Sequence, residues 1–240
     1  MNIILFDQKD YLDRVTIELT DRRFHHIRKI HRAKIGDRLR VGEENGLMGC
    51  GTIVAMNENL IRLQVELDEQ PPDPLDVCLA VALPRPPTFQ KVLQYCTSLG
   101  VKQFVFFHSK RVEKSYWKSH ALRDESWLEH LRLGLEQAKD TVVPRVQFYR
   151  KHRDFIDSFL EDKVECGSIF VADPSIEAVD SRDRIAKGKK ATVVLGPEAG
   201  LLSYEVDRIL GMGANRINLG DRILRVEVAA AVAASLFRRP

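Results

Sequence analysis

Hydrophobic and polar positions alternate over much of the first seventy residues, with the period of two that is typical of strands. The predicted strands are residues 15–19, 37–41, 51–56 and 60–67. Asn45-Gly46 stands between two of them and is a strong signal for a hairpin turn. One helix interrupts the pattern from about residue 21 to residue 30, with Asp21 as its candidate N-cap. Short strands at this spacing predict a small barrel.

A proline-rich segment separates this region from the rest of the chain. Gln70 is followed by Pro71, Pro72, Asp73 and Pro74, and three prolines in four residues cannot continue a strand or a helix. We therefore predict a domain border here, with a small β domain over residues 1–72 and a larger domain over residues 73–240.

The larger domain has a different pattern. Leu75–Leu83 is a nearly continuous apolar run, which is typical of a strand buried on both faces. Further strands are predicted at residues 104–107, 168–172 and 191–195, and helices at residues 88–99, 124–139, 203–210 and 225–237. Strands that alternate with helices predict an α/β domain with a parallel sheet.

Composition and charge exclude several classes of protein. Of the 240 residues, 44% are hydrophobic and 30% are charged, which argues against a disordered chain. The formal net charge of +3 permits a nucleic-acid partner without requiring one. The N-terminus does not resemble a secretion signal and no apolar run could span a membrane, so we expect a cytoplasmic protein with no membrane partner. The four cysteines show no CxxC spacing, so no metal site is predicted.

Two glycine turns near the C-terminus carry most of the chemical signal. The strand that ends at Leu195 runs into Gly196–Gly200, and Ser203 is a candidate N-cap for the helix that follows. A second short strand ends near Leu219 and is followed by Gly220 and then by an apolar helix. Ligands of open α/β sheets bind beyond the carboxyl ends of the strands, and glycine lets the backbone approach them closely. The two turns therefore predict a single pocket built from both sides.

The residues of these two stretches resemble those of a known family. LGPEAG at residues 195–200 and NLGDRILRVEVAA at residues 218–230 are similar to the patterns GPEGG and LGxRILRxETA. These patterns are the signatures of the bacterial small-subunit ribosomal RNA uridine-N3 methyltransferases, which belong to the SPOUT class. Upstream matches lie at residues 26–32, 35–37, 99–101, 109–111, 136–137 and 143–144, so the resemblance extends over nearly the whole chain.

The resemblance implies an α/β enzyme with two domains. Residues 1–72 would be a PUA-like barrel that binds RNA, and residues 73–240 would form a SPOUT domain tied in a trefoil knot. S-adenosylmethionine would bind in the knot, held largely by backbone groups. By position, the cofactor-binding residues would be Leu195, Gly196, Gly200, Leu219, Gly220 and Leu224. The protein would act as a homodimer on small-subunit (16S) ribosomal RNA.

Three charged residues of the two stretches are candidates for the chemistry. Arg225 could bind phosphate or polarise a uracil carbonyl, while Glu198 or Glu227 could accept the proton of N3 or orient Arg225. Structural alternatives stay open for them. Arg225 could pair with an acid at the helix start, and Glu227 lies in a predicted first helical turn, where acids favour the helix dipole.

Two basic clusters are candidates for RNA contact. The first comprises Arg22, Arg23, Arg28, Lys29, Arg32 and Lys34, and the second comprises Lys110, Arg111, Lys114 and Lys118, with Tyr116 and Trp117 among them. Cations interleaved with aromatic residues suit phosphate contact and base stacking. The alternative for each cluster is a solvated charged surface.

Five positions depart from the family pattern. The family usually has lysine at Tyr95, glutamate at Ser98, arginine at Asp140, glycine at Ala199 and threonine at Val228. The loss of two cations and the gain of Asp140 should weaken phosphate contact, because affinity for nucleic acid depends on neutralised phosphates. These departures favour a divergent member with an altered RNA substrate or low activity.

Two other functions remain open. A non-catalytic RNA-binding or ribosome-assembly relative would keep the fold and show no turnover. A SPOUT enzyme that acts on transfer RNA or on another base would show turnover on a different RNA.

Overall fold

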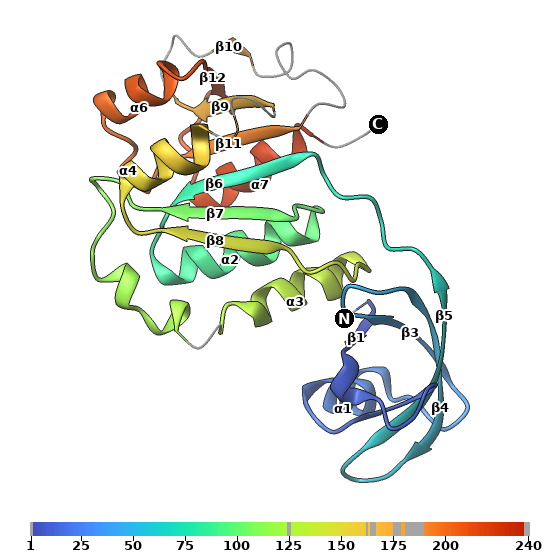
Figure 1. Cartoon of the computed structure of the whole chain (residues 1–240). Helices are drawn as coiled ribbons and strands as arrows, with labels where there is room; N and C mark the ends of the chain where they lie inside the picture. The colour runs from blue at the N-terminus through green and yellow to red at the C-terminus, as the bar shows by residue number, and fades with distance from the viewer. Residues whose placement is uncertain are drawn as a thin grey trace. The chain divides into compact units, whose positions relative to one another are not determined.

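The computed structural model describes residues 2–123, 126–161, 163, 167–174, 179–180 and 190–237. The chain divides into two compact units. Unit 1 comprises Met1–Asp73 and Leu135–Val143, and unit 2 comprises Pro74–Gly134 and Pro144–Pro240 (Figure 1). The border at Asp73 lies in the proline-rich segment, whereas Leu135–Val143 joins unit 1 from within the larger of the two sequence regions.

Unit 1 is built on a five-stranded sheet with the order β1-β3-β4-β5-β2. Its strands are β1 (Ile4–Phe6), β2 (Thr16–Leu19), β3 (Arg38–Glu43), β4 (Met48–Met56) and β5 (Ile61–Glu69). β1 pairs with β3 in parallel, and the other pairs are antiparallel. The four strands predicted from the alternation are confirmed, and Asn45 forms the β3–β4 turn with a positive φ of 62°. β1 was not predicted, because three buried residues in a row show no alternation.

The helix predicted near residue 21 is confirmed and changes its geometry along its length. α1 (Arg22–His26) begins at Asp21, whose carboxylate accepts the backbone N–H of Arg23, and it continues as a π-helical stretch over Ile27–His31. Arg32, in the left-handed region with a φ of 50°, ends it. The buried side chains of this helix pack with buried side chains of the sheet in one hydrophobic core.

The segment Leu135–Val143 completes unit 1. Leu135 packs with Ile3, Leu5 and Met48 in a separate small core. The buried hydroxyl of Thr141 donates a hydrogen bond of 2.6 Å to the carbonyl of Gly46. This segment therefore contributes both apolar and polar contacts to the N-terminal sheet.

Unit 2 contains a seven-stranded sheet with the order β10-β12-β9-β11-β6-β7-β8, in which every pair is parallel. The strands are β6 (Val77–Ala82), β7 (Gln103–Phe107), β8 (Arg145–Tyr149), β9 (Ser168–Ala172), β10 (Val179–Asp180), β11 (Ala191–Leu195) and β12 (Asn215–Asn218). The predicted parallel α/β sheet is thus confirmed. β8 was not predicted, because this edge strand is only partly buried.

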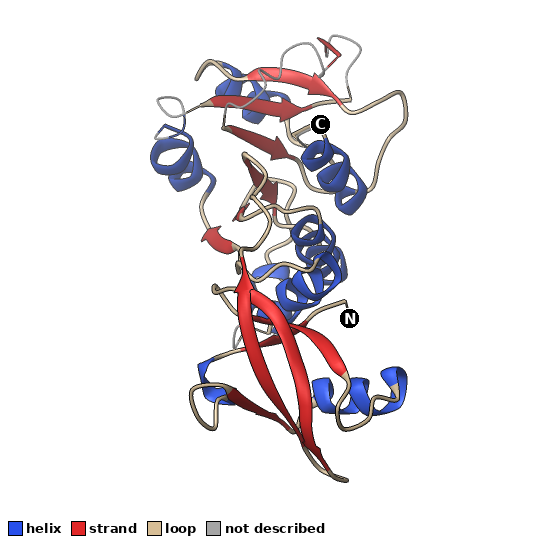
Figure 2. Cartoon of the chain, turned by 90° about the vertical axis from the view of Figure 1, so that its right-hand side faces the viewer, coloured by secondary structure: helices blue, strands red, loops and turns tan. Residues whose placement is uncertain are grey.

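Helices lie on both sides of this sheet (Figure 2). They are α2 (Pro86–Ser98), α3 (Leu128–Ala138), α4 (His152–Asp154, followed by π-helical turns over Phe155–Leu160), α6 (Ser203–Leu210) and α7 (Val226–Ser235). Short 3₁₀ turns cover Gln8–Asp10, Tyr116–Lys118 and His120–Leu122. α7 packs against α2 and against strands β6 and β11. No helix in the described part of the chain is long and apolar enough to cross a membrane.

Three predicted helix starts are corrected. α2 begins at Pro86, because proline is well suited to the first helical position. α3 begins at Leu128, four residues later than predicted, and residues 124–125 lie outside the described part. α6 has Leu202 as its N-cap, and Ser203 is its first helical residue. There the carboxylate of Glu205 accepts the backbone N–H of Leu202 at 2.9 Å, so an acid three residues on supplies the side-chain contact.

Candidate functional site

A cavity of about 820 Å³ lies in unit 2 at the carboxyl ends of neighbouring strands. Three segments line it: the end of β9, the turn between β11 and α6, and the turn between β12 and α7. Arg85 and Thr88, at the start of α2, add a fourth wall. The cavity lies where the sheet topology predicts a ligand site.

The two glycine turns hold their shape by local hydrogen bonds. Gly200 and Gly220 have φ angles of 75° and 119°, in the region that favours glycine. The amide of Gly200 donates to the carbonyl of Pro197 at 2.8 Å, and the amide of Gly220 donates to Oδ1 of Asn218 at 2.9 Å. A side chain at either glycine would therefore strain a turn that borders the cavity.

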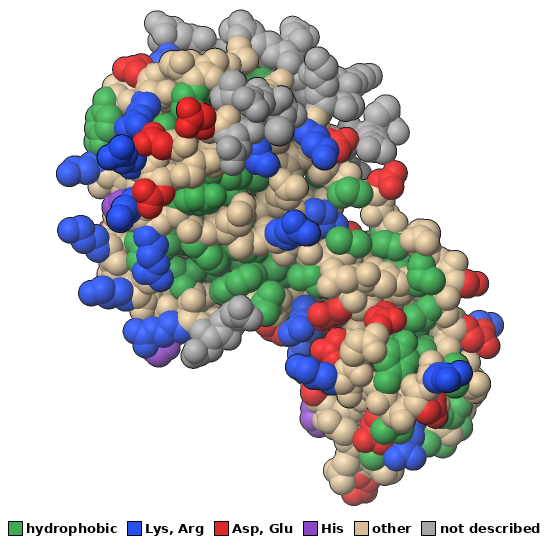
Figure 3. All heavy atoms as spheres, viewed as in Figure 1, with side chains coloured by type: hydrophobic (Ala, Val, Ile, Leu, Met, Phe, Trp, Pro, Cys, Tyr) green, Lys and Arg blue, Asp and Glu red, His purple; other side chains and the backbone are tan. Residues whose placement is uncertain are grey.

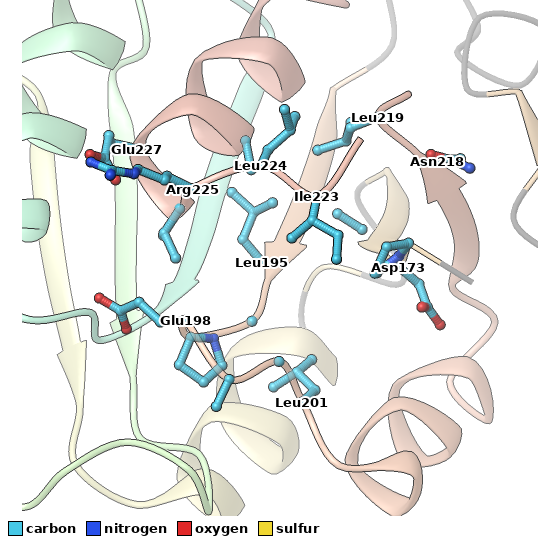
Figure 4. A pocket seen from close by; sticks show the side chains of 18 of the residues that line it. Asp173, Leu195, Glu198, Leu201, Asn218, Leu219, Ile223, Leu224, Arg225 and Glu227 are labelled. Atoms are coloured by element: carbon cyan, nitrogen blue, oxygen red, sulfur yellow. The ribbon is translucent and has the colours of Figure 1, made fainter. Parts of the chain in front are cut away.

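The cavity is apolar in its middle and polar at two ends (Figure 4). Leu195, Leu219, Ile223 and Leu224 lie in the middle of the view, and Ile223 is 91% exposed. The side chains of Glu198, Arg225 and Glu227 lie at one end, and those of Asp173 and Asn218 lie at the other. Such a lining suits a ligand that has an apolar ring and polar or charged groups.

All six residues predicted to bind a cofactor line this one cavity. They are Leu195, Gly196, Gly200, Leu219, Gly220 and Leu224. The three predicted catalytic residues, Arg225, Glu198 and Glu227, line it as well. Two stretches about twenty residues apart in the sequence are therefore brought together because β11 and β12 both pair with β9.

The carboxylates of the cavity each have a cationic neighbour. Oε1 of Glu198 accepts the backbone N–H of Arg85 at 3.2 Å and lies 3.9 Å from Nε of the same residue. Oε1 of Glu227 lies 3.5 Å from Nζ of Lys91. Oδ2 of Asp173 lies 3.6 Å from Nε of Arg216. The acids of the cavity are therefore already compensated.

Two arginines of the cavity differ from these acids. Arg225 is the N-cap residue of α7, and Arg222 lies in the turn before it, and both are exposed. Within the described residues, neither guanidinium has a hydrogen bond or ion pair, so the predicted pairing of Arg225 with a helix-start acid is not observed. The cavity therefore presents two uncompensated positive charges, which suits an anionic or electron-rich partner.

In unit 1 the first basic cluster divides into paired and exposed residues. Arg22 makes two hydrogen bonds, of 2.7 and 3.0 Å, to the buried carboxylate of Glu136. Arg23, only 15% exposed, bonds to Asp10 at 2.7 Å and to Asp21. Burial alone would lower the pKa of Arg23, but its hydrogen bonds to Asp10 and Asp21 raise it. These two arginines hold unit 1 together, and their charges are already used.

The other two predicted RNA contacts of unit 1 are exposed. Arg28 donates to the carbonyl of Glu58 at 3.0 Å and lies over the ring of Phe24. Arg32 is exposed at the end of the π-helical stretch. Of the four arginines predicted to contact RNA in this unit, Arg28 and Arg32 retain the accessible charge that the role requires.

In unit 2 the second basic cluster borders the cavity turn. A guanidinium nitrogen of Arg111 donates to the carbonyl of Ala199, and Lys114 is exposed. The loop after β8 adds Arg150, whose guanidinium lies 5.4 Å from the ring centroid of Trp117, and Lys151. Lys and Arg side chains gather along the margin of unit 2 where β7 and β8 end (Figure 3).

A buried carboxylate fixes the loop that carries Arg111. Glu205 is 1% exposed, and its Oε1 accepts the backbone N–H of Lys110 at 2.9 Å, while its Oε2 accepts that of Leu202. His152 lies beside it, with Nε2 at 3.8 Å from Oε1 of Glu205. Burial lowers the pKa of His152. Glu205 therefore ties the loop after β7 to the turn after β11.

The departures from the family pattern fall in different environments. Asp140 is 3% exposed, and its carboxylate accepts the backbone N–H of Val142 at 3.0 Å. Its carboxylate is thus turned inward, and the weakening of phosphate contact expected from Asp140 stays a prediction. The hydroxyl of Ser98 donates to the carbonyl of Tyr95, and Tyr95 and Val228 are exposed on the packed helices α2 and α7. Ala199 is exposed in the cavity turn.

Several lining residues were not predicted from the sequence. Arg85 follows β6 after a short loop, Asp173 comes directly after β9, and Asn218 ends β12. Each is a polar residue at the carboxyl end of a parallel strand. A polar residue at the carboxyl end of a parallel strand is therefore a usable signal for such a site.

Comparison with known proteins agrees with this geometry. A family model of the RNA methyltransferase domain matches residues 71–238, and the chain belongs to that family. The chain is 26% identical over 241 residues to ribosomal RNA small subunit methyltransferase E of Treponema pallidum, with 98% of this chain and 90% of that protein covered. It is 28% identical over 232 residues to the protein of the same name from Bacillus subtilis, with coverages of 92% and 88%. The family resemblance seen in the sequence is therefore confirmed.

Solved structures share the fold. The crystal structure of a ribosomal RNA small subunit methyltransferase E from Neisseria gonorrhoeae, bound to S-adenosylmethionine, matches with a TM-score of 0.75 and 21% identity. The match covers 98% of this chain and 95% of that one. The two chains therefore have the same overall fold despite low identity.

Proposed function

We propose that this protein is an S-adenosylmethionine-dependent methyltransferase that acts on N3 of a uridine in small-subunit (16S) ribosomal RNA. The observation that carries the proposal is the cavity of unit 2, which collects the predicted cofactor and catalytic residues at one edge of the sheet. Membership of the RNA methyltransferase domain family, and similarity to proteins named for the small-subunit RNA, support the substrate class.

The lining of the cavity fits S-adenosylmethionine. Its volume of about 820 Å³ is within the usual range for a small-molecule site. Leu195, Leu219 and Leu224 offer apolar walls for the adenine ring, and nothing lies within 4 Å of the position a Cβ would take at Gly220. When bound, S-adenosylmethionine supplies an electrophilic methyl group on its sulfonium sulfur.

The residues at one end of the cavity then assist the transfer. Arg225 donates hydrogen bonds to a uracil carbonyl, which makes the N3 proton more acidic. Glu227, which lines the same end, accepts that proton. Glu198 is engaged by the amide of Arg85 and keeps the turn after β11 in place. Holding the base and the methyl donor in line supplies much of the rate.

The RNA substrate must present an unpaired base. The N3 edge of uridine is normally paired, so the target is single-stranded or extruded from its helix. The exposed cations on the loops after β7 and β8, with Arg111 and Lys114 among them, would contact phosphates near the cavity. Unit 1 would be a PUA-like RNA-binding barrel, with Arg28 and Arg32 as its phosphate contacts.

Three further features complete the proposal. Unit 2 carries a trefoil knot, the chain works as a homodimer, and it is cytoplasmic, where its RNA substrate is found. The exposed side chain of Val228, on α7, supports the homodimer because it offers apolar surface to a second copy.

Calorimetric titration with S-adenosylmethionine, followed by transfer of labelled methyl groups to RNA, tests the proposal. We expect binding that is abolished by Gly220→Trp, and transfer to small-subunit RNA that maps to a uridine N3. Binding without transfer to any RNA would favour the non-catalytic relative. Transfer to transfer RNA, or to another base, would reassign the substrate. If the folded protein does not bind S-adenosylmethionine, the proposal that it is a methyltransferase is wrong.

A further inference from the structure

Three acids line the cavity of unit 2, namely Asp173, Glu198 and Glu227, and the side chain of Glu227 is the most buried of the three. Glu227 is 5% exposed, in the first turn of α7. Burial disfavours the charged form of a carboxyl group, and an isolated buried carboxylate tends to take up a proton. A carboxyl group that already holds a proton cannot accept one from a substrate. If Glu227 accepts the N3 proton, some group must keep it charged.

Lys91 is placed to do this. It lies on α2, which packs against α7, and its Nζ is 3.5 Å from Oε1 of Glu227. The side chain of Lys91 is 47% exposed and is not part of the cavity lining. The ammonium group thus reaches Glu227 from outside the cavity, and the space where the substrate would bind stays clear.

The other acids of the cavity do not need such help to the same degree. Glu198 is more exposed than Glu227 and receives a backbone N–H from Arg85, so it is supported by water and by a fixed donor. Arg225 stands only two residues before Glu227, but side chains two apart on a helix do not face each other, and these two are not paired. In the described part of the chain, Lys91 is the one cation within ion-pair distance of Glu227.

We propose that Lys91 is a positioning residue for methyl transfer, because it holds the buried carboxylate of Glu227 charged and fixed beside the bound base. The inference rests on the proposed function, since it assigns Glu227 as the acceptor of the N3 proton. Lys91 itself touches neither the base nor the methyl donor. Its contribution is the state and orientation of its partner.

The first experiment measures single-turnover methyl transfer against pH. We expect K91M to lower the rate about tenfold at neutral pH, which is less than the roughly 10²–10⁴-fold that a general base contributes, because Glu227 itself stays in place. The acid limb of its pH–rate profile should move to higher pH, because the carboxylate loses the charge that favours its ionised form. Affinity for S-adenosylmethionine should stay within about twofold, because Lys91 is outside the cavity lining. K91R should recover most of the rate.

A relocated cation provides a second test. Tyr95 lies one helical turn after Lys91, and residues four apart share a face of a helix. In the K91M background, Y95K should restore part of the rate and return the acid limb toward its original pH. A neutral substitution of the same residue, Y95M, is the matched control and should restore neither.

A double-mutant cycle in unfolding equilibrium reads the pair without any turnover. K91M should shift the unfolding equilibrium at pH 7 about fivefold more in the wild-type background than in the E227Q background. An unchanged K91M profile in an active protein, or a cycle with no coupling, would overturn the inference alone. A wild-type protein that transfers no methyl group would instead overturn the proposed function, and the assignment of Lys91 with it.

Discussion

Arg22 and Arg23 of unit 1 are used in the opposite way to Arg222 and Arg225 of the cavity in unit 2, although all four carry the same side chain. In unit 1, Arg22 and Arg23 are locked to carboxylates of the same unit, with Glu136 buried beneath the first of them. In unit 2, Arg222 and Arg225 stand exposed at the cavity, whose acids are compensated by other cations. The difference teaches that an arginine-rich stretch is informative only once its partners are known.

The comparison predicts its largest effect at Arg225. R225A should lower kcat/KM for RNA about a hundredfold or more, the scale for losing a charged donor to a developing negative charge. Unfolding free energy and cofactor affinity should change little, because the guanidinium has no partner within the described part of the chain. Steady-state kinetics, calorimetry and chemical denaturation measure the three quantities. A loss of stability comparable to the loss of activity would contradict the distinction.

Arg23 should behave in the reverse manner. R23A leaves the largely buried carboxylate of Asp10 without its main partner and removes one contact of the half-exposed Asp21. This should cost about 2–3 kcal/mol of unfolding free energy, somewhat less than the roughly 3–5 kcal/mol for a fully buried pair. Urea denaturation checks this. R32A is the matched control, since an exposed arginine should change stability by less than about 0.5 kcal/mol. Equal effects of the two substitutions would break the comparison.

A smaller effect concerns pH and the buried contact between His152 and Glu205. Burial lowers the folded-state pKa of His152 below its usual value of about 6.5. The unfolded chain then binds a proton first, so stability that is present above pH 6.5 is lost as the pH falls below it, by at most about 1.4 kcal/mol per pH unit for one proton. Denaturation at pH 7.5 and 5.5 should show a weaker pH dependence in H152N.

The smallest expected effect lies at Lys114. If its exposed ammonium group contacts one phosphate, K114A should weaken RNA binding a few-fold and reduce the slope of log affinity against log salt by about one. Fluorescence anisotropy over a salt series measures both. R22A should leave that slope unchanged, because its charge is committed to Glu136. A loss of slope at Arg22 would show that pairing does not remove an arginine from RNA contact.

Local pattern was sufficient for much of the fold. The alternation over Ile61–Glu69 predicts a strand buried on one face, and the uninterrupted apolar run around β6 predicts a strand buried on both faces. β1 and β8 were missed for the opposite reason. A three-residue buried strand and a partly exposed edge strand have no periodicity that separates them from a loop.

The cavity could be predicted better than the electrostatics around it. The glycine turns at Gly196–Gly200 and Gly220 can be recognised from their residue types. The strands before them bring them together because β11 and β12 both pair with β9. The partners of Glu227 and Arg23, in contrast, come from elements distant in the sequence or from an acid outside the motif. Asp140 shows the same limit, since its type suggests a surface charge and its backbone contact turns it inward.

The division of unit 1 into two pieces has a consequence for the order in which the protein is made. Residues 1–73 leave the ribosome well before Leu135–Val143. Until Leu135 has been synthesised, Ile3, Leu5 and Met48 lack the side chain that packs against them in the finished protein. Arg22 likewise has no ion pair with Glu136 until that residue has been synthesised. The packing of the N-terminal sheet is therefore completed only after α2 and β7 have been synthesised. A fragment that stops at Asp73 would expose apolar surface that is prone to aggregation. An isolated unit 1 therefore needs the later segment attached, for instance through a short linker.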